Sequence, residues 1–176
     1  MKKRHQALYL LDLMIKNNYK KFAEIGLWKC KSIKQMIHVN INNQIDEYWG
    51  VDNFNLVDRK GNGYSAGLTQ EIWDSAYFQA CELMINNPSL KIVRMKSMEA
   101  SELFKNEYLD MVFIDGSHDY DSVMEDIECW EPKIRKGGII SGHDYNSSYV
   151  GVKKAVDSVY KDRVKELPKK IWYVNL

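Results

Sequence analysis

The stretch "DMVFID" (residues 110–115) decides the fold, because it is apolar over four consecutive residues rather than at every second one. A strand with one face in water alternates apolar and polar residues, whereas a strand in a parallel sheet is buried on both faces and reads as a continuous apolar run. The run ends abruptly in Asp115, and His118 follows three residues later. We therefore expect a buried parallel strand whose carboxyl end carries groups that bind protons or metals.

Similar short apolar strands alternate with longer segments of helical period on both sides of this stretch. The expected strands are 22–26, 48–52, 91–95, 110–115 and 138–144. The expected helices are 28–40, 68–86, 97–106, 119–131 and 149–161, after an amphipathic first helix within residues 1–20. Strands separated by helices of this length are joined by right-handed crossovers. The pattern predicts an α/β fold with five parallel strands and helices on both faces of the sheet.

The end of the chain departs from this rhythm. Two strand-like runs, "RVKEL" (163–167) and "IWYVNL" (171–176), are separated only by "PKK". Three residues cannot hold a crossover helix, so the two runs should pair antiparallel. The prediction is a mostly parallel seven-stranded sheet that ends in an antiparallel hairpin, within one domain over 1–176. The segment 53–67 holds three of the ten glycines and follows a strand, which makes it a candidate active-site loop.

Composition narrows the class of protein. Lys and Arg (25) nearly balance Asp and Glu (24), so the net charge is +1 and no nucleic-acid partner is expected. The three cysteines lie far apart without a CxxC spacing, which argues against disulfides and a zinc site and favours the cytoplasm. No apolar run approaches the roughly 18 residues of a transmembrane helix, so no membrane association is expected.

Several of the expected strands end in acidic, histidine or glycine residues. In open α/β sheets, ligands bind outside the carboxyl ends of the strands. Any one of these residues has an ordinary structural explanation, because polar side chains usually emerge into solvent at strand ends. Their appearance together at one edge predicts a functional site. The residues are Glu24, Gly26, Asp52, Asp115, His143 and Asp144.

The turn "AEIGLWKCKS" (23–32) follows the first strand and opens a helix. A glycine there lets a ligand approach the backbone, but the two further glycines of the GxGxxG fingerprint are missing, which disfavours a bound pyrophosphate. Asp52 ends the second strand, where an acid accepts hydrogen bonds from ribose hydroxyls. A ribose-bearing cofactor without phosphate therefore fits better than NAD.

With these residues in place, the chain resembles the class I S-adenosylmethionine-dependent methyltransferases. It is most similar to the small O-methyltransferases with a late GHDY motif (methyltransferase family 24). The matching segments are "EIGLWKCKS" (24–32), "VDNF" (51–54), "MKSMEA" (95–100), "FIDGSHDYDSVMEDIECW" (113–130) and "GGIISGHDY" (137–145). Cys30 stands where the family usually has glycine. The resemblance implies a Rossmann-like fold and S-adenosyl-L-methionine as the cofactor.

The resemblance also implies roles for individual residues. Glu24 and Gly26 would line the methionine part of the cofactor, Asp52 would hold the ribose, and Ser97 and Met98 would flank the adenine. Ser97 also fits an ordinary helix N-cap, and the two roles are compatible. The full set of implied cofactor contacts is Glu24, Gly26, Trp28, Asp52, Ser97, Met98 and Asp115.

A divalent cation is a second implied component. Asp115 and Asp144 end strands that we expect to be neighbours, and two close carboxylates repel each other unless a proton or cation lies between them. Related enzymes place Mg²⁺ there, with Asp115, Asp144 and His143 as its ligands here. Imidazole suits iron, zinc or manganese better than magnesium, so His143 is a ligand of another metal, a second base, or part of a site without metal.

The leading hypothesis is methyl transfer to a hydroxyl group of a sugar, glycan or small natural product. His118 would act as general base, with Asp115 and His143 as further catalytic residues. The alternatives are a cofactor-binding module that is inactive or needs a partner, an NAD-dependent oxidoreductase and, least favoured, a metal-dependent phosphohydrolase. The short chain leaves little material for a substrate pocket, so the site is open or completed by another subunit of a homo-oligomer.

Overall fold

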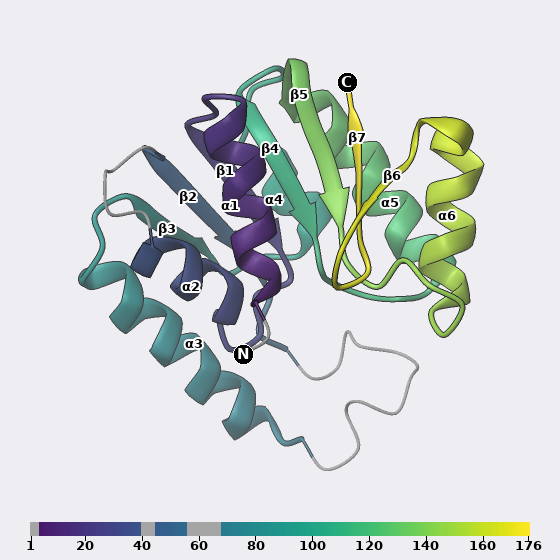
Figure 1. Ribbon diagram of the computed structural model, residues 1–176. Helices are drawn as coiled ribbons and strands as arrows, with labels where there is room; N and C mark the ends of the chain where they lie inside the picture. The colour runs from purple at the N-terminus through teal and green to yellow at the C-terminus, as the bar shows by residue number, and fades with distance from the viewer. Residues whose placement is uncertain (1–3, 40–44, 56–67) are drawn as a thin grey trace.

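The computed structural model describes residues 4–39, 45–55 and 68–176. Its centre is a seven-stranded sheet of order β3-β2-β1-β4-β5-β7-β6 (Figure 1). The strands are β1 (Lys21–Ile25), β2 (Glu47–Val51), β3 (Leu90–Val93), β4 (Leu109–Ile114), β5 (Ile134–Gly142), β6 (Lys165–Leu167) and β7 (Ile171–Asn175). The first five are parallel to one another, and β7 pairs antiparallel with both β5 and β6. The predicted mostly parallel sheet with a terminal hairpin is confirmed.

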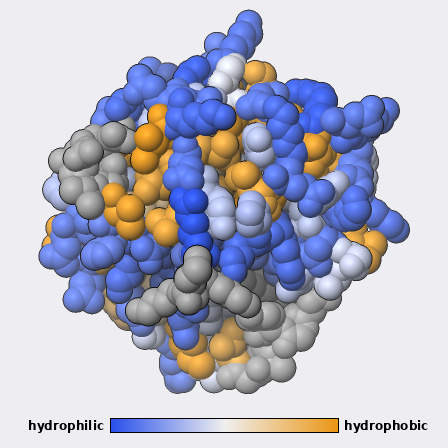
Figure 2. All heavy atoms as spheres, in the orientation of Figure 1, coloured by the Kyte–Doolittle hydropathy of each residue, from blue (hydrophilic) through white to orange (hydrophobic). Residues whose placement is uncertain are grey.

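Helices cover both faces of this sheet, as Figure 1 shows. The molecular surface in the same view is mostly hydrophilic, with scattered apolar patches (Figure 2). The helices are α1 (Gln6–Lys16), α2 (Lys31–Val39), α3 (Gln70–Ile85), α4 (Ser97–Ser101), α5 (Tyr120–Trp130) and α6 (Val150–Tyr160). Two short 3₁₀ helices, η2 (Glu131–Lys133) and η3 (Lys161–Arg163), follow α5 and α6. The first three helices bury their apolar residues in one hydrophobic cluster, and the last three in a second cluster on the other face. No helix of the described ranges is long and apolar enough to cross a membrane.

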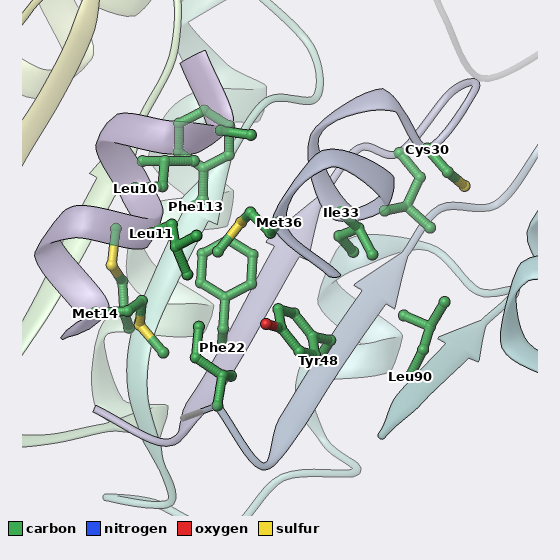
Figure 3. Packing of buried hydrophobic residues seen from close by; sticks show 14 of the residues in the cluster. Leu10, Leu11, Met14, Phe22, Cys30, Ile33, Met36, Tyr48, Leu90 and Phe113 are labelled. Carbon is green, nitrogen blue, oxygen red and sulfur yellow. The ribbon is translucent and has the colours of Figure 1, made fainter. Parts of the chain in front are cut away.

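The central strand β4 is buried on both faces, as its unbroken apolar run predicts. Met111 and Phe113 belong to the cluster under α1, α2 and α3, whereas Val112 and Ile114 belong to the cluster under α4, α5 and α6. Successive side chains of a strand point to opposite faces, so one run of four apolar residues serves both clusters. Figure 3 shows the first cluster, in which side chains of α1 and α2 pack with Phe22, Tyr48 and Phe113 of the strands.

The helix expected over 97–106 is wrong in length, because α4 ends at Ser101. The next turn continues with shorter i to i−3 bonds, from the Leu103 N–H to the Ala100 carbonyl and from the Phe104 N–H to the Ser101 carbonyl. This tightening accompanies the packing of Phe104 edge-on against Trp49 and Trp130, with ring centroids 4.9 and 5.2 Å away. Tertiary packing therefore ends the helix where local propensity does not.

The strand register brings the predicted site residues to one edge. Ile114 of β4 lies beside Gly142 of β5 and beside Ile25 of β1, and Ile25 lies beside Val51 of β2. The residues after these four positions therefore emerge together, next to the start of α1 (Figure 1). Most of the candidate loop 53–67, namely residues 56–67, lies outside the described residues.

Candidate active site

The turn after β1 depends on the absence of a side chain at Gly26. Its φ is +91°, and a Cβ placed there would lie 2.4 Å from the Asp115 carbonyl oxygen and 2.7 Å from the Gly116 Cα. Real Cβ atoms do not approach backbone this closely, and the positive φ is strained for any L side chain. Gly26 therefore lets the ends of β1 and β4 meet in close contact at the sheet edge.

Asp52 braces the same turn from β2. One oxygen of its carboxylate accepts the N–H groups of Leu27 and Trp28, at 2.9 and 3.0 Å. The other accepts the Phe54 N–H at 2.8 Å. The side chain is buried, so these bonds satisfy N–H groups that would otherwise be costly to leave unpaired. The acid predicted to hold a ribose thus also fixes the shape of the glycine turn.

Cys30, which stands where the resemblance expects glycine, has a left-handed backbone conformation. Its φ is +55°, in the left-handed region, and its side chain is buried in the cluster under α1, α2 and α3. A non-glycine residue pays about 1 kcal/mol for this conformation. The turn is therefore left-handed at position 30 although the residue is not glycine, and burial of the side chain offsets part of the strain.

The turn opens onto a pocket of about 440 Å³ at the sheet edge. Its floor is formed by the ends of β1, β4 and β5, and its wall by the edge-on ring pair of Trp28 and Trp73, whose centroids are 4.0 Å apart. The pocket brings together the following predicted residues: Glu24, Gly26, Trp28, Asp115, His118, His143 and Asp144. Asp52, Ser97 and Met98 line a neighbouring pocket of about 770 Å³. Gly26, Gly116 and Ser117 border both pockets.

Glu24 is the most deeply buried acid of the site. Its side chain is 2 % exposed, and its Oε2 atom has no hydrogen-bond partner among the described residues. Burial raises the pKa of this carboxyl well above its usual range, and the nearby Asp115 raises it further, against opposing hydrogen bonds from Ser32 and the Ile33 N–H. A buried carboxyl oxygen without a partner costs free energy, so a cationic ligand group would be strongly favoured beside it.

Two histidines and two aspartates form the polar centre of the pocket. His118 Nε2 lies 3.0 Å from Asp144 Oδ2. His143 Nδ1 lies 3.2 Å from the same Asp144 oxygen and 3.4 Å from Asp115 Oδ1. The two carboxylates that the sequence places at neighbouring strand ends are therefore bridged by the His143 ring. Asp144 also has a left-handed backbone, with φ +57°, which aims its side chain back into the pocket.

The histidines and aspartates of this group stabilise one another's charged forms. Burial opposes the charged form of His143, but the hydrogen bonds that its ring donates to Asp115 and Asp144 outweigh this effect and raise its pKa to about 10. Burial likewise disfavours ionisation of Asp144, but His118 and His143 hold the pKa of that carboxyl far below its usual range. The protonated His143 ring thus supplies the positive charge that two adjacent carboxylates require.

The same group offers ligands for a metal ion. Asp115, His118 and Asp144 each offer one ligand atom, and these atoms lie within 4.8 Å of one another. The third donor of this set is His118, whereas the expectation from the sequence was His143. Two carboxylates and an imidazole suit manganese, iron or zinc better than magnesium. A cation here would compete with the proton on His143 for the same two carboxylates.

Ser97 is not the N-cap of α4, because Lys96 occupies that position. Its hydroxyl donates instead to Asp126 of α5 and accepts the indole N–H of Trp130 at 2.8 Å. The single O–H donor is used by Asp126, so a contact of this hydroxyl with adenine would have to use its second lone pair as an acceptor. Asp126 lines the same pocket as Asp52 and Met98, and burial raises its pKa to about 6 against the hydrogen bond from Ser97.

Replacing Asp126 with asparagine is expected to stabilise the protein increasingly as the pH rises. The pKa of Asp126 in the folded protein, about 6, lies above that of an unfolded aspartate. The wild type therefore has its full free energy of unfolding below about pH 4 and loses part of it as the pH rises through 6. The gain should grow from about 0.5 kcal/mol at pH 4 to about 3 kcal/mol at pH 8. Urea unfolding at pH 5 and pH 8 measures it. Asp121→Asn, at an exposed position of the same helix, is the control, and an equal gain at both pH values would contradict the prediction.

Sequence reasoning missed several residues that the fold brings to the site. Gln6 of α1 donates to Asp115 Oδ2 and Ser32 Oγ, both at 3.2 Å, and Tyr149 packs against the His118 ring with centroids 4.5 Å apart. His5 and Lys31 also line the pocket. The shortage of chain to form a substrate pocket was the signal in the sequence, and it does not select any of these residues.

A family model described as "Methyltransferase domain" (methyltransferase family 24) matches residues 23–145, which hold all the strand ends of the site. The chain belongs to this family. It is an S-adenosylmethionine-dependent methyltransferase, and the nicotinamide alternative is wrong. A search of curated proteins found no match.

Solved structures of other methyltransferases have the same fold as this chain. CalS11, a TDP-rhamnose 3'-O-methyltransferase of calicheamicin biosynthesis, is 16% identical with a TM-score of 0.65, over 98% of this chain and 81% of its own. The O-methyltransferase NovP is 17% identical with a TM-score of 0.64, over 96% and 77%. An O-methyltransferase from Bacillus cereus in complex with SAH is 16% identical with a TM-score of 0.57, over 97% and 80%. At these identities, the likeness establishes the fold.

Proposed function

We propose that this methyltransferase methylates a hydroxyl group of a sugar or small natural product. The observation that carries the proposal is that the pocket joins a buried acid at the cofactor turn, Glu24, to a histidine that is paired with a carboxylate, His118 with Asp144. Glu24 fits the cationic end of the cofactor, and His118 with its carboxylate partner fits a base for an acceptor hydroxyl. The acceptor class also agrees with the activity of CalS11, which methylates TDP-rhamnose.

The cofactor would span the two pockets. The ammonium group of its methionine part fits against Glu24 Oε2, the buried carboxyl oxygen that has no partner among the described residues. Its ribose would approach Asp52, and its adenine would lie along Met98 and the start of α4. Trp28, from the wall of the first pocket, would shield the methionine part from water. Gly26 and Gly116, which border both pockets, leave space for the cofactor to pass between them.

His118 would act as the general base. With its Nε2–H donating to Asp144, the lone pair of the ring lies on Nδ1. The acceptor oxygen attacks the methyl carbon, the bond from that carbon to sulfur breaks, and the hydroxyl proton passes to His118. Asp144 orients the ring and stabilises the imidazolium that forms, as a carboxylate does for a catalytic histidine in general. The protonated His143 would steady the two carboxylates while this occurs.

A divalent cation is compatible with this site. Asp115, His118 and Asp144 would hold it, and it would lower the pKa of a hydroxyl bound to it. In that case His118 would be a ligand, and the proton of the acceptor would pass to another group or to water. Dependence of activity on the cation separates the two arrangements.

The experiment that tests the proposed function is ligand-induced thermal stabilisation. The protein is heated with S-adenosylhomocysteine, S-adenosylmethionine or NAD, each with Mg²⁺, Mn²⁺ or EDTA. We expect both adenosyl compounds to raise Tm and NAD to leave it unchanged, because a ligand stabilises the state that binds it. An increment that needs Mn²⁺ or Mg²⁺ would support the metal site. Release of S-adenosylhomocysteine in a screen of glycosides, nucleotide sugars and phenols then tests O-methylation, and turnover of amines alone would refute it.

Glu24→Gln is expected to weaken binding of S-adenosylhomocysteine while it stabilises the free protein. The variant keeps the shape of the side chain but loses the charge that pairs with the ammonium group, so Kd should rise by about tenfold to a hundredfold. The neutral amide is cheaper to bury than a carboxylate, so Tm of the free protein should rise. Isothermal titration calorimetry and thermal unfolding measure the two effects.

The matched control is Glu47→Gln in β2. Glu47 accepts hydrogen bonds from Trp49 and Tyr108 and lies outside both pockets. This variant should leave Kd unchanged and lower Tm. Unchanged binding in Glu24→Gln would remove Glu24 from the cofactor site.

A further inference from the structure

A groove adjoins the active-site pocket and continues outward from it. It has a volume of about 540 Å³ and lies between the start of α1, one face of α2 and the end of α3. His5 and Lys31 line both this groove and the active-site pocket, so the two spaces meet at these residues. An acceptor that places its hydroxyl at His118 would extend from the pocket into this groove.

Among the described residues, the groove is lined by lysine and histidine side chains and by no acid. Lys34 and His38 add to His5 and Lys31. Lys31, Lys34 and His38 are spaced i, i+3 and i+7, so they follow one face of α2. All three are exposed, and α2 has no acid in its first turn to neutralise them.

His5 is held so that it can donate into the groove. Its Nδ1 accepts the Ala7 N–H at 3.2 Å, as the N-cap of α1, which leaves Nε2 as the ring donor. Burial lowers the pKa of His5, and the positive charges of Lys31 and Lys169 lower it further. Within the described part of the chain, the mouth of the pocket is thus a region of positive potential, which favours an anion.

We infer that the acceptor of this methyltransferase carries a phosphoryl group, such as the diphosphate of an activated sugar, and that Lys31, Lys34 and His5 bind it in this groove. The inference rests on the proposed function, because it places the acceptor hydroxyl at His118. A diphosphate spreads its negative charge over several oxygens, which matches cations placed one helical turn apart better than a single carboxylate does.

Calorimetric titration of inorganic pyrophosphate into the full-length protein saturated with S-adenosylhomocysteine tests the inference. The wild type should bind, and the affinity should fall as NaCl rises from 50 to 200 mM. The double variant Lys31→Gln/Lys34→Gln should bind at least about tenfold more weakly. The control is Lys105→Gln/Lys136→Gln, which removes the same charge from exposed positions next to the amino ends of β4 and β5, and it should bind within about twofold of the wild type.

Three results would overturn the inference. The first is a wild type that binds S-adenosylhomocysteine but not pyrophosphate, and this result leaves the proposed function intact. A protein that binds neither compound would refute the inference and the proposed function together. The second is competition between pyrophosphate and S-adenosylhomocysteine, which would assign the lysines to the carboxylate of the cofactor. The third is glucuronate binding as tightly as pyrophosphate, which would replace the phosphoryl group with a carboxylate. Retained S-adenosylhomocysteine binding in the double variant shows that it is folded.

Discussion

Replacing His118 with asparagine is expected to lower kcat by a factor of about 10² to 10⁴, the usual contribution of a positioned general base. The ring is partly exposed at the mouth of the pocket, so its removal should leave the fold and the affinity for S-adenosylhomocysteine unchanged. Release of S-adenosylhomocysteine with an acceptor found by screening measures kcat, and calorimetry measures the affinity. An unchanged kcat would remove His118 from the chemistry.

A substitution of Asp144, the partner of His118, tests the same role. Asp144→Asn keeps a residue that tolerates the left-handed backbone, with φ +57°, but loses the charge that lies 3.0 Å from His118 Nε2. If the two side chains work as one unit, each single variant should lose nearly as much activity as the double variant. Losses that multiply in the double variant would show that Asp144 acts independently of His118, for example through a metal ion.

Gly26→Ala is expected to destabilise the protein by about 2 to 5 kcal/mol and to abolish binding of the cofactor. Two effects add here. The positive φ costs a side chain about 1 to 2 kcal/mol, and relief of the contact with the Asp115 carbonyl, 2.4 Å from the new Cβ, would require backbone movement that costs about 1 to 3 kcal/mol more. Urea unfolding measures the loss of stability, and calorimetry measures the loss of S-adenosylhomocysteine binding.

Two other glycines separate these effects. Gly137 has φ +75°, but its Cβ would meet nothing closer than a side-chain nitrogen of Arg135 at 3.7 Å, so Gly137→Ala should cost only the conformational part. Gly116 has no positive φ, and its Cβ would lie 3.6 Å from the nearest atom, so Gly116→Ala should cost less than about 1 kcal/mol. A loss in Gly26→Ala no larger than in Gly137→Ala would show that the contact with β4 yields easily.

The sheet was predictable because its signals are local. The apolar run of β4 and the three-residue link between β6 and β7 each limit the structure that their own residues can form. The edge of the sheet at which Glu24, Asp52, Asp115 and Asp144 gather follows from the same signals, since the carboxyl ends of parallel strands share one edge. The end of α4 was not predictable, because it depends on the ring of Phe104 packing against strand and helix residues far away in the sequence.

Contacts within the site were less predictable than its location. Gln6 reaches Asp115 across 109 positions of sequence, and Ser97 reaches Asp126 across 29. The sequence offered an N-cap role for Ser97, which is a local interaction, and the fold replaced it with a distant one. The third donor of the group that could hold a metal ion is His118 rather than His143, and this likewise depends on how the loop after β4 turns toward the end of β5.

The sequence by itself thus determined the α/β fold, the edge of the sheet that carries the site, and the family, because strand burial, crossover length and motif spacing are properties of short segments. Only the tertiary structure decided which hydrogen bonds occupy Asp52 and Ser97, that a buried oxygen of Glu24 has no partner among the described residues, and that a basic groove leads out of the pocket. These features depend on distances between side chains from separate elements, and no local pattern fixes those distances until the helices have packed against the sheet.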